Sequence, residues 1–444
     1  MSNPSGAAHE VGIHEILFSA TNAGGLISET NAAFAALTGV PRKRLLGTTS
    51  EIMRRPFVPA GVALAMHDAL TEGQVVCGYL DQSDDLGRSV RTFTVITPQE
   101  DGRLALQVRP GVEAELQRFD QCCVGVNSIE DVFRGSGAAE DVVARAGQAQ
   151  FEALLQQSGH GGLQSFTRTA LPAEVRHRAQ LRSSRQWPSS NDGYHRLLLA
   201  EIRWLDTLLQ RWLPQLDGLH SLTSSLAGAG HRLDVIANSA GAQAQAFDHI
   251  LIHNGIGQQA FSVRQWIGSA HEQRTVTDEY CATARTLVAP LDDAQWQLAL
   301  AVLHSEALTY AAVELCEEAL DPMPTRRAMR LLLTTIDQTI PTILRCVGEV
   351  VDRTHALGEF AARLSDLTAT RVDLLEGWQR RAGSRFDEGT DRLRPEVADA
   401  LREDQGDQRF HAHLATRSRS IQGLDGDEFR TQLEKVWGLV EALT

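Results

Sequence analysis

Apolar and polar positions near the N-terminus alternate in short runs that predict two strands and a helix. Leu17–Ala20 is a brief apolar run, Ala23–Gly25 is a turn signal, and Leu26–Ile27 resumes the strand. Asn31 is a residue type that caps helices, and the apolar Phe34 follows at helical spacing. The pattern therefore predicts strand, turn, strand and short helix in this order.

A second group of apolar runs, separated by polar turn segments, predicts the rest of an antiparallel sheet. The runs are Val75–Leu80, Val90–Thr97 and Leu104–Val108. Between the two groups, Ala60–Leu70 has the composition of a helix, and Gly73 is placed to end it.

Beyond residue 110 the β-branched runs stop, and two segments carry apolar residues at heptad spacing. The first is Leu198, Ile202, Leu205, Leu209, Trp212, Leu216 and Leu219. The second is Leu333, Ile336, Ile340, Ile343, Val347, Val350, Leu357 and Leu364, with Thr354 in one heptad position. Pro214 and Pro341 lie within these segments and should bend them. Trp296–Glu318 is a further apolar helix.

These patterns predict an α+β fold, in which an N-terminal antiparallel sheet with flanking helices precedes a mainly helical bundle or coiled-coil region. The predicted segments are a disordered tail at 1–10, a sensor-sized domain at 11–110, a helical connector and polar linker at 111–193, a helical region at 194–385, and a charged, loosely packed tail with a terminal helix at 386–444. Heptad seams need a bundle or a partner chain. We expect a homodimer, and a monomeric bundle folded on itself is the alternative.

The composition excludes several classes of function. A formal net charge of −14 over 444 residues argues against nucleic-acid binding, which needs a dense basic face. No apolar run approaches the roughly 20 residues of a membrane helix, and the first residues lack a signal-peptide pattern. The six cysteines have neither disulfide-framework nor zinc spacing. From these observations we expect a cytoplasmic location.

The N-terminal block resembles a PAS domain of the aerotaxis-receptor type. The resemblance rests on Leu17–Ala23, Thr30–Phe34, Thr38-Gly39, Leu45–Gly47 and Thr97-Pro98. It implies a small sensor fold that binds a ligand or a partner and passes on a conformational signal. The family's His and Asp are absent from Arg54–Pro59, and an aromatic pair is absent from Arg91–Phe93, which weighs against a flavin.

Two later segments resemble the signalling tip of a chemoreceptor in degenerate form. Ala237–Ala246 is similar to the small-residue helix of the tip, and Gly257–Arg264 is similar to the returning segment. The resemblance implies contacts with a signalling protein through 237–264.

The resemblance also implies a set of pocket residues, whose role would be apolar enclosure of a ligand: Phe34, Ile52, Met66, Leu70, Tyr79, Phe93 and Val95. His67 lies on the helix that lines the pocket in PAS folds, and it is the candidate axial ligand of a haem iron. FAD is a second, less favoured candidate cofactor, and the third hypothesis is a pocket that holds no cofactor.

The remaining motifs carry less chemistry. Cys77 lacks a cationic neighbour in sequence, so packing explains it better than redox sensing. His249 and His253 share a helix face, but no acidic third ligand follows at a useful spacing. No Walker loop, nucleophile elbow or paired catalytic carboxylates occur. We therefore expect a non-enzymatic sensory protein, with a scaffold built on an empty PAS domain as the alternative.

Overall fold

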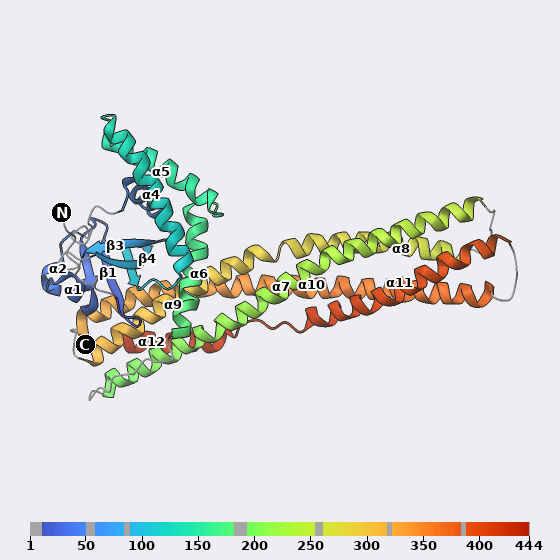
Figure 1. Ribbon diagram of the computed structural model, residues 1–444. Coiled ribbons are helices and arrows are strands. Elements are labelled where there is room, and N and C mark those ends of the chain that lie inside the picture. The colour runs from blue at the N-terminus through green and yellow to red at the C-terminus, as the bar shows by residue number, and fades with distance from the viewer. Residues whose placement is uncertain are drawn as a thin grey trace. The chain divides into compact units, whose positions relative to one another are not determined.

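The structure is a computed structural model that describes residues 11–49, 58–83, 89–181, 193–253, 261–317, 322–382 and 388–443 (Figure 1). The chain divides into two compact units, and each draws on segments far apart in sequence. Unit 1 comprises 1–213, 295–343 and 425–444, and unit 2 comprises 214–294 and 344–424. This division differs from the consecutive segments predicted from the sequence, because the long helices contribute to both units.

Unit 1 contains a five-stranded antiparallel sheet with the order β2-β1-β5-β4-β3. Its strands are β1 (Ile16–Asn22), β2 (Ile27–Thr30), β3 (Val76–Ser83), β4 (Ser89–Gln99) and β5 (Gly102–Val108). Each lies where the apolar runs predicted a strand, so the coarse α+β prediction is confirmed.

Three helices separate β2 from β3 in the described residues: α1 (Ala32–Thr38), α2 (Arg42–Leu45) and α3 (Ala60–Thr71). Asn31 caps α1 as predicted, since its side chain accepts a hydrogen bond from the Phe34 amide. Gly73 has a φ of 77°, which ends α3 in a conformation that favours glycine.

Helices α4 (Glu113–Gly135), α5 (Glu140–Gln157) and α6 (Leu163–Leu181) follow the sheet. Helix α3 crosses α5 closely, because a Cβ on Gly61 would lie 2.1 Å from the backbone carbon of Gly147. The Glu130 carboxylate, 1% exposed, accepts a hydrogen bond of 2.7 Å from the Gly61 amide and pairs with Arg134. Gly61 and Gly147 thus allow the backbones of α3 and α5 to touch, and Glu130 attaches α4 to α3.

The remaining helices are long, and several pass from one unit into the other. They are α7 (Gly193–His253), α8 (Phe261–Arg285), α9 (Val288–Cys316), α10 (Pro322–Ala382), α11 (Glu388–Arg419) and α12 (Gly426–Glu441). Helices α7 and α10 continue through Pro214 and Pro341. Pro290 lies in the first turn of α9, where a missing N–H costs little.

Both predicted heptad seams are buried within the single chain, and every residue in them is at most 7% exposed. They therefore do not require a partner chain to cover them, and the homodimer stays a prediction. The predicted loosely packed tail is wrong, because α11 contributes Leu393, Val397 and Ala400 to the core of unit 2. The charged residues of α11 occupy its outer positions and hid this apolar stripe.

Unit 2 contains a buried polar layer within its apolar core. Arg371 is 0% exposed and forms an ion pair of 2.7 Å with Asp404. The same guanidinium hydrogen-bonds Gln273, and the Trp266 indole donates to Asp404 at 2.8 Å. Burial raises the pKa of Asp404 to about 6, although Arg371 opposes the shift. The layer joins α8, α10 and α11.

One described helical stretch, within Phe261–Cys316, is long and apolar enough to cross a membrane by length and composition. Of its most apolar window, 94% is buried inside the protein, which is the pattern of a core helix. The apolar runs along the sequence did not reveal it, since the window contains scattered polar residues.

Candidate functional site

The strand registers give the sheet two faces of different chemistry. Phe18, Leu106, Val95 and Cys77 are aligned across β1, β5, β4 and β3, and they share a face with Phe93, which we call the Phe93 face. The opposite side, called the Thr94 face, carries the following residues at alternate positions: Leu17, Ser19, Gly78, Gln82, Val90, Thr92, Thr94 and Gln107.

The Phe93 face is a packed aromatic and apolar core. The ring of Tyr79 lies 5.1 Å from that of Phe93 on this face. At the β3 edge of the sheet, the Tyr79 ring also lies 5.9 Å from that of Phe119 on α4, which is 5.3 Å from Phe166 on α6. Three of the predicted pocket residues, Tyr79, Phe93 and Val95, are at most 1% exposed on this face. Their side chains therefore point away from the side of the sheet where Met66 lies.

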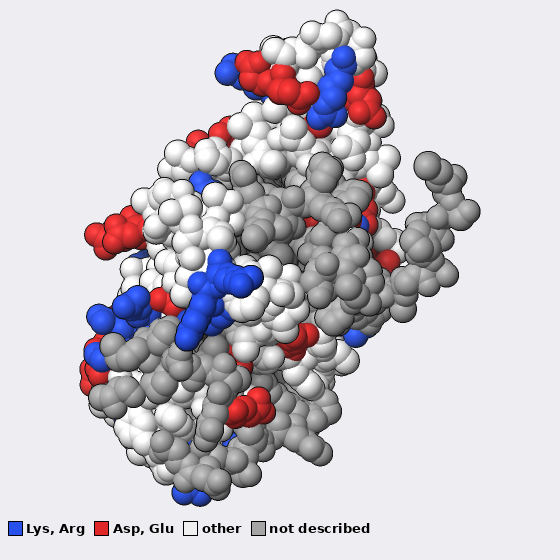
Figure 2. Space-filling model, turned by 90° about the vertical axis from the view of Figure 1, so that its left-hand side faces the viewer, with Lys and Arg blue, Asp and Glu red and all other residues white. Residues whose placement is uncertain are grey.

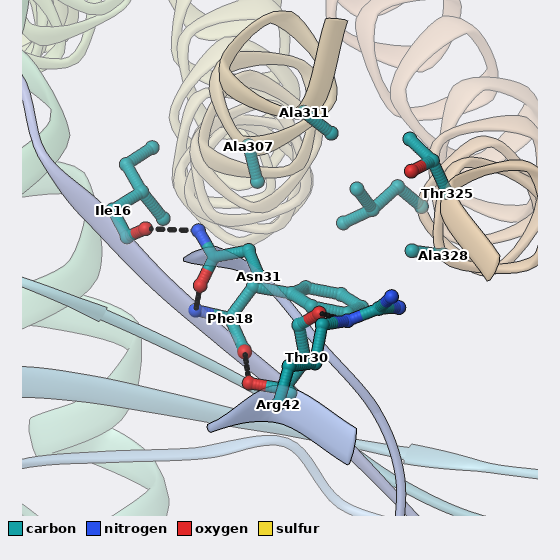
Figure 3. A pocket seen from close by; sticks show the side chains of 10 residues that line it. Ile16, Phe18, Thr30, Asn31, Arg42, Ala307, Ala311, Thr325 and Ala328 are labelled. Carbon is teal, nitrogen blue, oxygen red and sulfur yellow. Dashed lines mark hydrogen bonds between the residues drawn. The ribbon is translucent and has the colours of Figure 1, made fainter. Parts of the chain in front are cut away.

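Next to these rings, α9 and α10 cover the part of the Phe93 face formed by Ile16 and Phe18 (Figure 3). A cavity of about 10 Å³ separates them, and its lining includes Asn31, Arg42 and Ala307. That volume suits about one water molecule. The Asn31 amide donates to the Ile16 carbonyl at 2.7 Å and accepts from the Phe18 amide at 3.0 Å. This cavity is too small for haem or flavin.

The Thr94 face is unusual for a covered sheet, because its buried centre is polar. Thr92 and Thr94 are 0% and 2% exposed, and Gln82 and Gln107 are each 7% exposed. The two threonine hydroxyls lie 3.0 Å apart, and the Gln82 amide nitrogen donates to Thr92 at 3.5 Å. The Oε1 atoms of Gln82 and Gln107 have no hydrogen-bond partner among the described residues. Buried amide oxygens without partners are costly, and a bound molecule or water is the usual explanation.

Helix α3 lies on the Thr94 side of the sheet. A Cβ on Gly78 would lie 3.5 Å from Met66 Cε and 2.9 Å from a ring carbon of Phe119, so this position needs glycine. Phe34 on α1 belongs to the buried cluster that includes Leu17 and Val90 of the same face. Met66 and Leu70 are buried, at 6% and 7% exposure. Ile52 lies outside the described residues.

His67, the candidate haem ligand, is exposed on α3. Its Nδ1 lies 3.4 Å from Nη2 of Arg103 on β5. An axial haem ligand would be enclosed by apolar side chains. The placement does not support the haem interpretation, because neighbouring helix positions rather than His67 take the buried side.

The other candidate groups remain inert in this geometry. Cys77 is buried, and burial raises the pKa of its thiol, so little thiolate forms at neutral pH. The rings of His249 and His253 lie 4.0 Å apart near the end of α7. No group of three or more His, Cys, Asp or Glu side chains among the described residues is arranged to hold a metal ion.

Figure 2 shows basic and acidic side chains interspersed over one face of the molecule, among the residues described there. No broad area of a single charge stands out among the described atoms on that face, so this view does not indicate an electrostatic docking site.

Two buried acids that the sequence analysis missed join the sheet module to α9 and α10. Glu314 on α9 is 4% exposed and accepts from the Ala33 and Ala32 amides at 3.1 and 3.3 Å. Burial raises the pKa of Glu314 to about 7, against the effect of these hydrogen bonds. Glu29 on β2 pairs with Arg42 at 3.2 Å and Arg327 at 3.7 Å. Neither acid belongs to a motif.

No protein-family model matches this chain, and no curated protein matches it.

Proposed function

We propose that this chain is a sensory signal-transduction protein, in which a PAS-type module binds a small polar ligand and helices relay its presence. The sheet order β2-β1-β5-β4-β3, with the helices between β2 and β3, supports the PAS interpretation. A cytoplasmic, non-enzymatic and homodimeric protein with a signalling partner at 237–264 completes the proposal.

The observation that carries the proposal is the polar centre of the Thr94 face. Its threonine hydroxyls, and its glutamine oxygens that lack partners among the described residues, offer both donors and acceptors to a ligand. Apolar side chains from α1 and α3 lie on the same side of the sheet. An apolar enclosure with few polar groups is the common composition of small-molecule sites.

The alternative is a non-enzymatic scaffold whose PAS-type module is empty. The exposure of His67 favours it over a haem sensor. A visible spectrum of the purified protein distinguishes the cofactor hypotheses. A Soret band indicates haem, and absorption near ~450 nm indicates flavin. A colourless protein is consistent with a colourless ligand or with the scaffold.

Native mass spectrometry of the purified full chain tests the proposal directly. We expect a small molecule to co-purify, to leave on denaturation, and to be reduced in Thr94→Val and Gln107→Leu. Thr97→Val is the matched control, because Thr97 is buried on the same strand but belongs to the Phe93 face. Absence of a bound molecule from the wild-type chain, or equal loss in all three variants, contradicts the proposal.

A further inference from the structure

Helix α6 runs along the free edge of the sheet. Thr167 Oγ1 accepts a hydrogen bond of 3.2 Å from the Cys77 amide of β3, and the Gln164 side chain donates to the Val75 carbonyl at 3.4 Å. Strand β3 is the last strand of the sheet, so its outward backbone groups would otherwise lack partners. Helix α6 is thus attached to the sheet rather than merely near it.

The carboxylate of Glu174 on α6 accepts three hydrogen bonds from the sheet module. Its Oε1 accepts from the Tyr79 hydroxyl at 2.8 Å and the Val112 amide at 3.0 Å, and its Oε2 accepts from the Gly111 amide at 2.8 Å. Glu174 is 1% exposed. Burial and the Glu174 carboxylate raise the pKa of Tyr79, so its hydroxyl stays protonated and donates. One carboxylate therefore joins β3 to the segment that leaves β5.

One helical turn later, Arg178 of α6 contacts the core helix α9. Its Nη2 and Nε donate to the two oxygens of Glu306 at 2.6 and 3.2 Å. Both side chains are about 95% buried, at 4% and 5% exposure. A bidentate pair of this kind fixes orientation as well as distance. Arg178 Nη1 has no hydrogen-bond partner among the described residues, so this arrangement leaves one buried donor unsatisfied.

We propose that α6 is the coupling element between the sheet module and α9, with Glu174 and Arg178 as its two positioning residues. The inference rests on the proposed sensory function and names how its signal leaves the sheet. Because both contacts lie on one rigid helix and are geometrically strict, a shift of β3 or of the β5–α4 segment displaces Arg178 relative to Glu306. The unsatisfied Nη1 lowers the cost of a second arrangement.

Hydrogen exchange of the full chain tests this coupling without any ligand. Tyr79→Phe removes only the hydroxyl that donates to Glu174. We expect exchange in α9 around Glu306 to rise about tenfold, since a lost bond to a buried carboxylate loosens α6 at both ends. Tyr280→Phe is the matched control, because it removes a buried hydroxyl that donates to the Leu226 carbonyl in unit 2.

A double-mutant cycle supplies the second arm. Arg178→Met combined with Glu306→Leu removes the ion pair without leaving a buried charge, and it keeps the test valid if Arg178→Met alone fails to fold. If α6 carries the coupling, adding Tyr79→Phe to this pair produces no further exchange in α9. Additive effects, or a Tyr79→Phe effect confined to β3, overturn the proposal. Loss of ligand binding with coupling retained would instead refute the proposed function.

Discussion

At the scale of single residues, the buried charges decide which substitutions the fold tolerates. In unit 2, Arg371→Met leaves the Asp404 carboxylate buried without its cation. We expect a loss of about 3–5 kcal/mol in the free energy of unfolding. Arg371→Met with Asp404→Asn should recover most of this loss, because Asn still accepts from Trp266. Chemical denaturation measures both, and an unchanged midpoint for Arg371→Met would refute the polar layer.

The raised pKa of Glu314 predicts how the stability of unit 1 depends on pH. Its pKa in the folded chain, about 7, lies above the ordinary value, so the folded state binds the proton more tightly. Its stabilising contribution is therefore complete below about pH 4.3 and disappears as the pH rises through 7. At ~1.4 kcal/mol per pKa unit, the effect is on the order of 3–4 kcal/mol.

Thermal unfolding of Glu314→Gln across pH 5–8 tests this sign. We expect the melting temperature of the wild type to fall between pH 5 and 8, and that of the variant to stay nearly constant over this range. Glu434→Gln on α12 is the control, since Glu434 is exposed in the same unit and does not act on Glu314. The prediction would be contradicted if the wild type became more stable from pH 5 to 8 and the Glu314→Gln variant did not. Arg42 and Glu317 are the charged groups that act on Glu314.

At the scale of elements, the sequence predicted the strands and helices well but not the partners of their faces. Alternation located the β-strands, and heptads located α7 and α10. Alternation cannot tell a buried polar face from a solvated one, so it does not indicate that Gln82 and Gln107 are buried. It also could not assign Tyr79 and Phe93 to the face opposite Met66. Glu174 and Glu314 carry no local signal, because their roles depend on contacts with distant segments.

The crossing of α3 and α5 gives a prediction at this scale. Gly61→Ala places a methyl group 2.1 Å from the Gly147 backbone, so we expect the helices to separate and stability to fall by several kcal/mol. Gly348→Ala is the matched control, because nothing lies within 4 Å of a Cβ there. That control should gain about 0.5–1 kcal/mol from higher helix propensity. Similar effects for both variants in thermal unfolding would refute the close crossing.

At the scale of the whole molecule, the heptad seams are covered inside one chain. We therefore expect the unfolding midpoint to be independent of protein concentration, even if two copies associate through another surface. Calorimetry over a hundredfold dilution measures this. A midpoint that rises with concentration would show that a second copy completes the fold.

The most direct test of the sensory account is hydrogen exchange of the full chain before and after removal of the molecule that co-purifies with it. The account predicts faster exchange after removal in two places, β4 and β5 around Thr94 and Gln107, and α9 around Glu306. Changes confined to the sheet would leave a binding protein without a relay. Unchanged exchange in both places would contradict the account.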